Sequence, residues 1–172
     1  MHRILFCIAA AATVFLMGAH AWALPSYKDA NWGVVPQDHG NACIVVMNSE
    51  DKMHAFHFVV DGQTNAVTVG ILDSFAPDRL SAGSPKITVD FGPLFVRQLQ
   101  FEHRSQGSVG FLAADLSHDD LKNILAALQS GLSGVSLSFA DGEVWRIPGP
   151  KQEAASAIAR CWNEALGGTR VT

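Results

Sequence analysis

Residues 42–47, Ala-Cys-Ile-Val-Val-Met, begin the part of the chain that decides its fold. Two more short apolar runs follow, Phe56–Val60 and Ala66–Leu72, with Asp61-Gly62 between them. β-Branched and aromatic side chains favour strands, and Asp-Gly fits the positive φ angles of a type I′ hairpin turn. The connection can also run longer, through Asn65. These runs predict adjacent antiparallel strands.

Strand patterns also dominate the residues on either side of this centre. From Trp32 the chain is mostly strand-like, and Asp73–Pro85 has the Ser, Pro, Gly and Asp content of a loop. Near the C-terminus, alternating apolar and Ser residues precede an Asp141-Gly142 turn, which predicts a hairpin. The further strands expected are Lys86–Phe91, Leu94–His103, Ser108–Ala113, Val135–Phe139 and Val144–Ile147.

One helix is predicted in the middle of the chain. Ser117 is a good N-cap, and Asp120 three residues later makes a variant of the capping box. Gly131 can end the helix in the left-handed conformation. The apolar stripe at helical spacing consists of Leu121, Ile124, Leu125 and Leu128.

A second helix is expected over Lys151–Leu166, with Pro150 suited to the first helical position and Gly167-Gly168 as the stop. Its apolar stripe is Ala154, Ile158, Cys161, Trp162 and Ala165. Cys161 therefore faces the core. The fold class expected is α+β, an antiparallel β-sheet or open barrel of about seven to nine strands with two helices.

Composition excludes several classes of protein. Of 172 residues, 48% are apolar and 16% are charged, so the chain has too much apolar side chain to be intrinsically disordered. Only one long apolar run exists, which excludes a polytopic membrane protein. The net charge of −4 and the lack of a Lys/Arg block argue against a nucleic-acid partner. One domain is expected for this length.

Residues 1–23 have the layout of a cleaved secretory signal peptide. Arg3 precedes the apolar run Ile4–Met17, and Ala21-Trp22-Ala23 supplies an A-x-A cleavage site. The alternative, an uncleaved membrane anchor, is disfavoured because this run is short for a ~30 Å hydrocarbon core. We therefore expect residues 24–172 to be a single exported domain, periplasmic or secreted, with at most peripheral membrane association.

The cysteine content is consistent with an exported protein. Cys7 lies within the predicted signal peptide, which leaves Cys43 and Cys161 as an even pair in an oxidising compartment. We expect a disulfide between them that reinforces a core large enough to form without it. Two catalytic or metal-binding thiols would be the alternative, but no motif supports it.

Five segments along the chain form a pattern: Trp32-Gly33-Val34, Cys43–Val46, Ile87–Pro93, Gly110–Ala114 and the Leu-rich helix Leu121–Leu128. In these segments the chain resembles the invasion-associated locus B family of exported bacterial proteins. The resemblance covers about Trp32 to Ala159. It implies a small, β-rich accessory protein, and it implies no catalytic residues.

The chain departs from this family at two places. The cysteine usual around the middle strands is missing from Leu99–Ser108, and Pro148–Lys151 replaces the family's final segment. The helix that carries Cys161 is more similar to the Ala-rich C-terminal helices of small alphaproteobacterial periplasmic proteins.

Catalytic and metal-binding motifs are not found in the sequence. On a strand, His54 and His57 would point to opposite faces, so a shared metal, with or without His103, is disfavoured. Asp90 and Glu102 could form a carboxylate pair, but nothing in the sequence places them together. No metalloprotease, nucleophile-elbow, phosphate-binding, dinucleotide or haem motif is present. We therefore expect no cofactor and no metal.

These observations favour a non-enzymatic exported accessory protein that binds another periplasmic or envelope protein through its sheet. One alternative is a small non-redox subunit of a periplasmic oxidoreductase complex. A second is a carrier for a small apolar ligand, which would need an internal cavity. A third is a hydrolase, which would need a deep pocket lined by at least two of His54, His57, His103, Asp90 and Glu102.

Overall fold

The computed structural model describes residues 26–37, 41–73, 84–106 and 109–167. Within these ranges the chain forms eleven strands in two antiparallel sheets, together with two helices, so the predicted α+β class is confirmed. The predicted signal peptide, residues 1–23, and most of the predicted loop at residues 73–85 lie outside the described residues.

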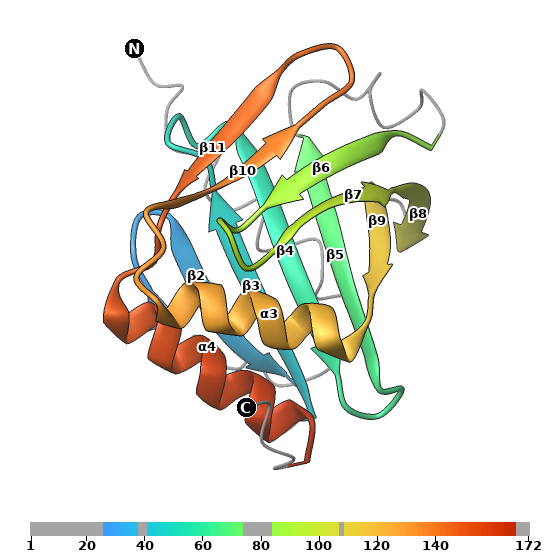
Figure 1. Ribbon diagram of the computed structural model, residues 1–172. Helices are drawn as coiled ribbons and strands as arrows, with labels where there is room; N and C mark the ends of the chain where they lie inside the picture. The colour runs from blue at the N-terminus through green and yellow to red at the C-terminus, as the bar shows by residue number, and fades with distance from the viewer. Residues whose placement is uncertain (1–25, 38–40, 74–83, 107–108, 168–172) are drawn as a thin grey trace, which may run out of the picture.

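Seven strands form the larger sheet, in the order β1-β2-β3-β4-β5-β9-β8 (Figure 1). The three runs that decide the fold are its central strands, and they pair as predicted. The β4–β5 connection takes the longer form, with Asn65 in the left-handed region at φ 56°. The bounds are β1 (Tyr27–Lys28), β2 (Trp32–Gln37), β3 (Ala42–Asn48), β4 (His54–Asp61), β5 (Ala66–Asp73), β8 (Glu102–Gln106) and β9 (Val109–Leu116).

Four strands form the smaller sheet, in the order β11-β10-β6-β7. The hairpin predicted at Asp141-Gly142 joins β10 to β11, and Gly142 takes a φ of +90° in the turn. The bounds are β6 (Lys86–Asp90), β7 (Val96–Gln100), β10 (Gly134–Ser138) and β11 (Val144–Pro148).

The segment predicted as one strand, Leu94–His103, contributes to both sheets. β7 pairs with β6 in the small sheet, whereas β8 pairs with β9 in the large one. Phe101 lies between them with no exposed surface, and its backbone N–H donates to the carbonyl of Pro85 at 2.9 Å. The chain therefore changes sheets at a buried aromatic residue, a step that periodicity alone does not signal.

The first helix, α3 (His118–Gln129), begins as predicted. Ser117 is the N-cap and forms a complete capping box with Asp120. The predicted Leu and Ile stripe is buried, and Gly131 follows with a φ of +81°. The C-terminal helix is α4 (Gln152–Ala165). It begins one residue later than predicted, after the N-cap Lys151. Gly167 follows the helix with a φ of +69°.

The core lies on one face of the large sheet. The small sheet covers one part of this inner face, and α3 and α4 cover the rest (Figure 1). Phe58 of β4 contacts both partners, because its ring centroid lies 5.6 Å from Phe91 beside the small sheet and 5.9 Å from Trp162 of α4. Trp32 of β2 joins the layers by donating its indole N–H to the carbonyl of Pro148 at 2.8 Å.

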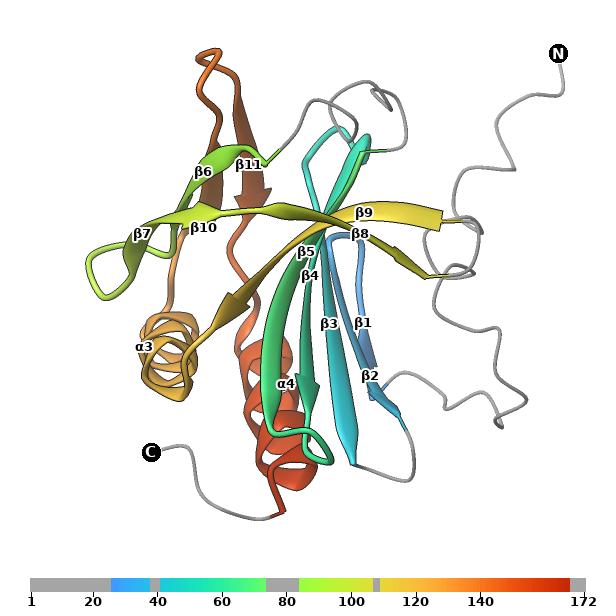
Figure 2. The ribbon, with the colours of Figure 1, turned by 90° about the vertical axis from the view of Figure 1, so that its right-hand side faces the viewer.

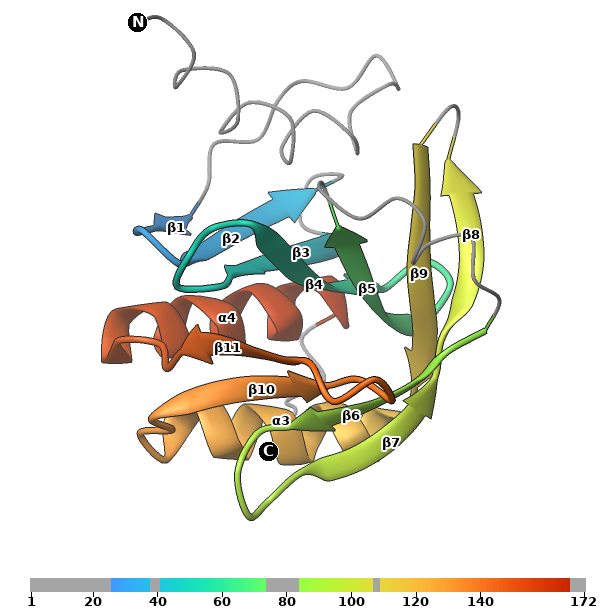
Figure 3. The ribbon, with the colours of Figure 1, turned by 90° about the horizontal axis from the view of Figure 1, so that it is seen from above.

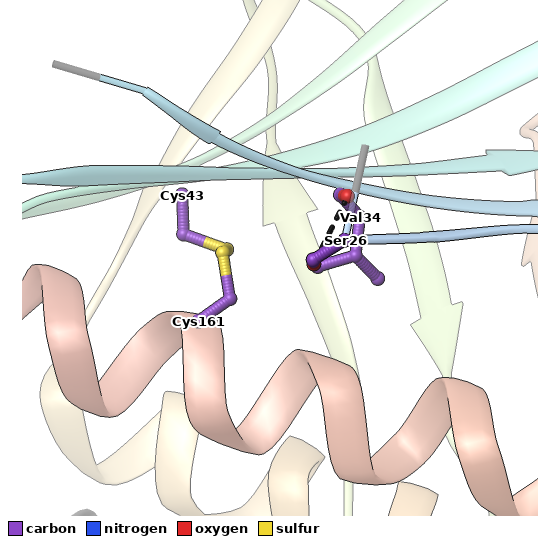
Figure 4. The surroundings of a disulfide bond; sticks show 4 residues. All are labelled: Ser26, Val34, Cys43 and Cys161. Atoms are coloured by element: carbon purple, nitrogen blue, oxygen red, sulfur yellow. Dashed lines mark hydrogen bonds between the residues drawn. A yellow bond between two sulfur atoms is a disulfide. The ribbon is translucent and has the colours of Figure 1, made fainter. Parts of the chain in front are cut away.

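A disulfide joins Cys43 of β3 to Cys161 of α4, as predicted (Figure 4). Both cysteines are buried, and 118 residues separate them along the chain. The bond attaches the last helix directly to the central part of the large sheet. Among the described residues, no helix has the length and apolar character needed to cross a membrane.

We expect the double variant Cys43→Ala/Cys161→Ala to fold but to lose stability. Loop-closure entropy for a loop of this length is worth about 4–5 kcal/mol, and the large core should keep the variant folded. Urea unfolding, followed by tryptophan fluorescence with and without a reductant, measures the loss. The reductant should lower the stability of the wild-type chain and leave that of the variant unchanged. Equal stability of wild type and variant in the absence of reductant would contradict the prediction.

Candidate binding face of the large sheet

The large sheet has a second face that neither helix covers. Figure 2 shows α3 and α4 on one side of β2–β5. The inner side chains of β3, Cys43, Val45 and Met47, are buried in the core. Strands with one face in water usually alternate apolar and polar residues, but Ile44 and Val46 on the outer face of β3 are also apolar. We call this side of the large sheet the outer face.

Apolar side chains form a continuous row across three strands of the outer face. Val35 of β2 pairs with Ile44 of β3, which pairs with Val59 of β4. All three are half-buried. Directly paired residues on one face lie about 4.5–5.5 Å apart, so these side chains are in contact range. The row is a continuous apolar surface on the side of the sheet that the helices leave uncovered.

A neighbouring row contains the most unusual residue of the outer face. Val46, His57, Gly70 and Ala113 follow one another across β3, β4, β5 and β9. His57 is only 2% exposed. Its imidazole lies over Gly70, because a Cβ added to that glycine would be 2.1 Å from His57 Nε2. The ring centroid of Phe111 lies 6.2 Å away.

Burial determines the charge state of His57. Removal of the imidazole from water disfavours its protonated form and lowers its pKa to about 4. The side chain is therefore neutral at physiological pH, and it places no charge beneath the apolar surface. The glycine in the run Ala66–Leu72 is the sequence signal for this close approach, since a glycine inside a strand often marks one.

Polar and charged residues border the apolar surface at β5, β8 and β9. Arg104 donates two hydrogen bonds to Asp115, at 3.0 and 2.8 Å, and Thr68 donates a third at 3.2 Å. These bonds lower the pKa of Asp115 and raise the pKa of Arg104. Thr68 lies next to Val59 in the register of β4 and β5. An apolar centre with a polar border is the usual arrangement of a protein interface.

The two histidines of β4 point to opposite faces, as predicted. His57 is on the outer face, whereas the ring of His54 is stacked on Trp145 of β11, with a centroid distance of 4.0 Å and an interplanar angle of 14°. His103 is on β8, where its imidazole lies over Gly110. No group of three or more His, Cys, Asp or Glu residues suited to a metal occurs in the part of the chain that the structure describes.

The two candidate carboxylates belong to different sheets. Asp90 ends β6 and accepts a hydrogen bond from the backbone N–H of Gly92 at 2.6 Å, so it stabilises a turn. Glu102 begins β8, is exposed and pairs with Ala113. The structure therefore does not bring Asp90 and Glu102 together in a carboxylate pair. The hydrolase hypothesis required at least two of His54, His57, His103, Asp90 and Glu102 in one pocket; the structure separates His54 from His57 and Asp90 from Glu102.

Ser49 and Asp51 lie in the turn between β3 and β4, and His54 begins β4; the three have the residue types of a catalytic triad. The hydroxyl of Ser49 donates to Asp51 Oδ1 at 2.5 Å and accepts from the backbone N–H of His54 at 3.2 Å. The hydrogen bond from Ser49 lowers the pKa of Asp51. In a triad the serine donates to an imidazole, so these bonds shape a turn and do not activate a nucleophile.

Searches of family models, of curated proteins and of solved structures found no match to this chain. The outer face is therefore interpreted from its own residues. Sequence reasoning treated Ile44, Val46 and Val59 as ordinary strand residues and missed this face. The available signal was that apolar residues occupy consecutive positions in β3 and β4, as in strands that are buried on both sides.

We expect stability to fall as the pH decreases from about 6.5 towards 4. The folded-state pKa of His57 lies below its unfolded value of 6.5, so the unfolded chain binds the extra proton in this range. The contribution of His57 to the free energy of unfolding amounts to about 3 kcal/mol. It is complete above pH 6.5 and is lost below about pH 4. Urea unfolding at a series of pH values measures it.

The matched variant is His57→Gln, which cannot titrate in this range. Other groups change charge in acid, so the relevant quantity is the difference in slope between wild type and variant. A flatter dependence of the free energy of unfolding on pH is expected for His57→Gln between pH 4.5 and 6.5. Parallel curves for the two proteins would show that His57 is not the group responsible.

Proposed function

We propose that the chain is an exported, non-enzymatic accessory protein that binds another protein of the bacterial cell envelope through the outer face of the large sheet. The observation that carries the proposal is the apolar row Val35–Ile44–Val59 on the side that the helices leave uncovered. These side chains are half-buried, and an apolar surface bordered by polar residues is typical of sites of protein association.

The chemistry of the outer face favours binding over catalysis. Its central residues are aliphatic, and His57, the titratable residue among them, is buried and neutral. The charged pair Arg104–Asp115 is at the border, where ion pairs add more to specificity than to affinity. Such a surface can hold a partner, and it offers no group placed to transfer a proton or attack a substrate.

Two further observations agree with an exported accessory protein. The Cys43–Cys161 disulfide is compatible with an oxidising compartment outside the cytoplasm. The resemblance of residues 32–159 to the invasion-associated locus B family, proposed from sequence segments, implies the same class of protein. The alternative hypothesis is a non-redox subunit of a periplasmic oxidoreductase complex. It names the oxidoreductase as the bound protein, so identification of the bound protein tests this alternative.

Site-specific photo-crosslinking in the bacterium that makes the protein tests the proposal. A photoreactive amino acid at Val59 should form an adduct with one discrete envelope protein, because Val59 lies in the apolar row. The matched control is Val144, an exposed apolar residue of β11 in the other sheet, which should give no such adduct. Adducts of equal yield from both positions, or none from Val59, would contradict the proposal.

A second measurement uses the partner identified by the adduct. Ile44→Glu places a charge at the centre of the apolar row and should weaken the complex at least tenfold, whereas Val144→Glu should not. Thermal unfolding of both variants separates lost binding from lost folding. Unchanged affinity of a folded Ile44→Glu protein would remove the outer face from the interface.

A further inference from the structure

The turn that joins β6 to β7 is stabilised by two buried phenylalanine rings and a backbone hydrogen bond. The buried rings of Phe91 and Phe95 lie 6.0 Å apart, and the backbone N–H of Phe91 donates to the carbonyl of Phe95 at 2.8 Å. The next apolar residues point outward. Leu94 is 49% exposed and Val96 is 56% exposed, the largest values for bulky apolar side chains in the described ranges.

β7 is an edge strand with an open side. In the described part of the chain it pairs with β6, and Figure 3 shows it at the margin of the small sheet. The carbonyl of Phe95 and the N–H of Phe101 both bond towards the β6 side. Backbone groups alternate along a strand, so those of Val96, Gln98 and Gln100 are directed to the open side.

The other edges differ from β7. At the edge of β11 a backbone group already has a partner within the chain, because the N–H of Glu50 donates to the carbonyl of Arg146 at 3.3 Å. β8 carries charges at Glu102 and Arg104, which discourage the pairing of edges. β1 has only two residues. β7 has no proline and no lysine, two common devices that protect an edge.

The single charge of β7 is already neutralised. Arg97 forms an ion pair with Asp120 of α3, with an Nη1–Oδ1 distance of 3.1 Å. Asp120 is fixed in turn by Ser117, whose hydroxyl donates to it at 2.8 Å. An inward-pointing charge can guard an edge, but here a partner within the same chain compensates it. Asp120 therefore compensates the charge of Arg97 within each copy.

We propose that two copies of the chain associate through β7, antiparallel and related by a two-fold axis at Gln98. Only this register pairs all five residues of β7 with a second β7. It places Val96 opposite Gln100 and Arg97 opposite Leu99 of the second copy, so no like charges face each other. The two small sheets become one sheet of eight strands, and the second copy covers part of the exposed Val96. This interface is separate from the outer face of the large sheet.

Sedimentation velocity of the purified, oxidised chain tests the association. A reversible monomer–dimer equilibrium is expected between about 1 µM and 1 mM, because the interface is short. Gln98→Asp and Gln98→Lys each place like charges opposite each other at the axis and should each be monomeric. An equimolar mixture of the two variants should restore the dimer, since opposite charges then meet.

Backbone pairing is tested separately. Gln98→Pro removes an N–H that is directed to the open side, so it should abolish the dimer while the hairpin survives, as proline is tolerated on an edge strand. Gln98→Ala keeps the N–H and should dimerise. Val144→Asp, on the opposite edge of the small sheet, should dimerise as the wild type does. A monomeric wild type over the whole range, no rescue in the mixture, or equal loss in Val144→Asp would overturn the proposal.

Discussion

The attachment of α4 to the inner face of the large sheet is the constraint on which the rest of the structure depends. Cys161 is bonded to Cys43 of β3, and Trp162, the next residue, is completely buried against Phe58 of β4. With α4 fixed there, α3 and the small sheet cover the remaining part of the inner face. Both helices are then on one side, and the opposite side of the sheet is left to the aliphatic residues of β2, β3 and β4.

This arrangement separates the molecule into surfaces with different chemistry. The outer face of the large sheet is aliphatic, with a neutral buried histidine and a charged border. The β6–β7 hairpin offers open backbone groups beside two exposed apolar residues. A side-chain surface suits a folded partner, whereas an open strand edge suits another strand. The two proposed interfaces therefore use different forces and need not compete.

Much of the fold followed from local patterns, because local chemistry decides it. Ser117 and Asp120 cap α3 as expected, and the disulfide joins the expected cysteines. The division into two sheets was not predictable, because Leu94–His103 has a single periodicity although the chain changes sheets at Phe101. The candidate surface was also missed. Which side of a strand stays uncovered depends on where helices pack, and residue spacing does not contain that information.

The disulfide has a consequence for the timing of folding during synthesis. Cys43 is made early, but its partner is made only after eight further strands and α3. Until then one thiol of the central sheet has no native partner, and the helix that closes the inner layer does not exist. Folding of this protein is therefore completed late, after nearly all its secondary structure has been synthesised, and the bond can form only when α4 lies against β3.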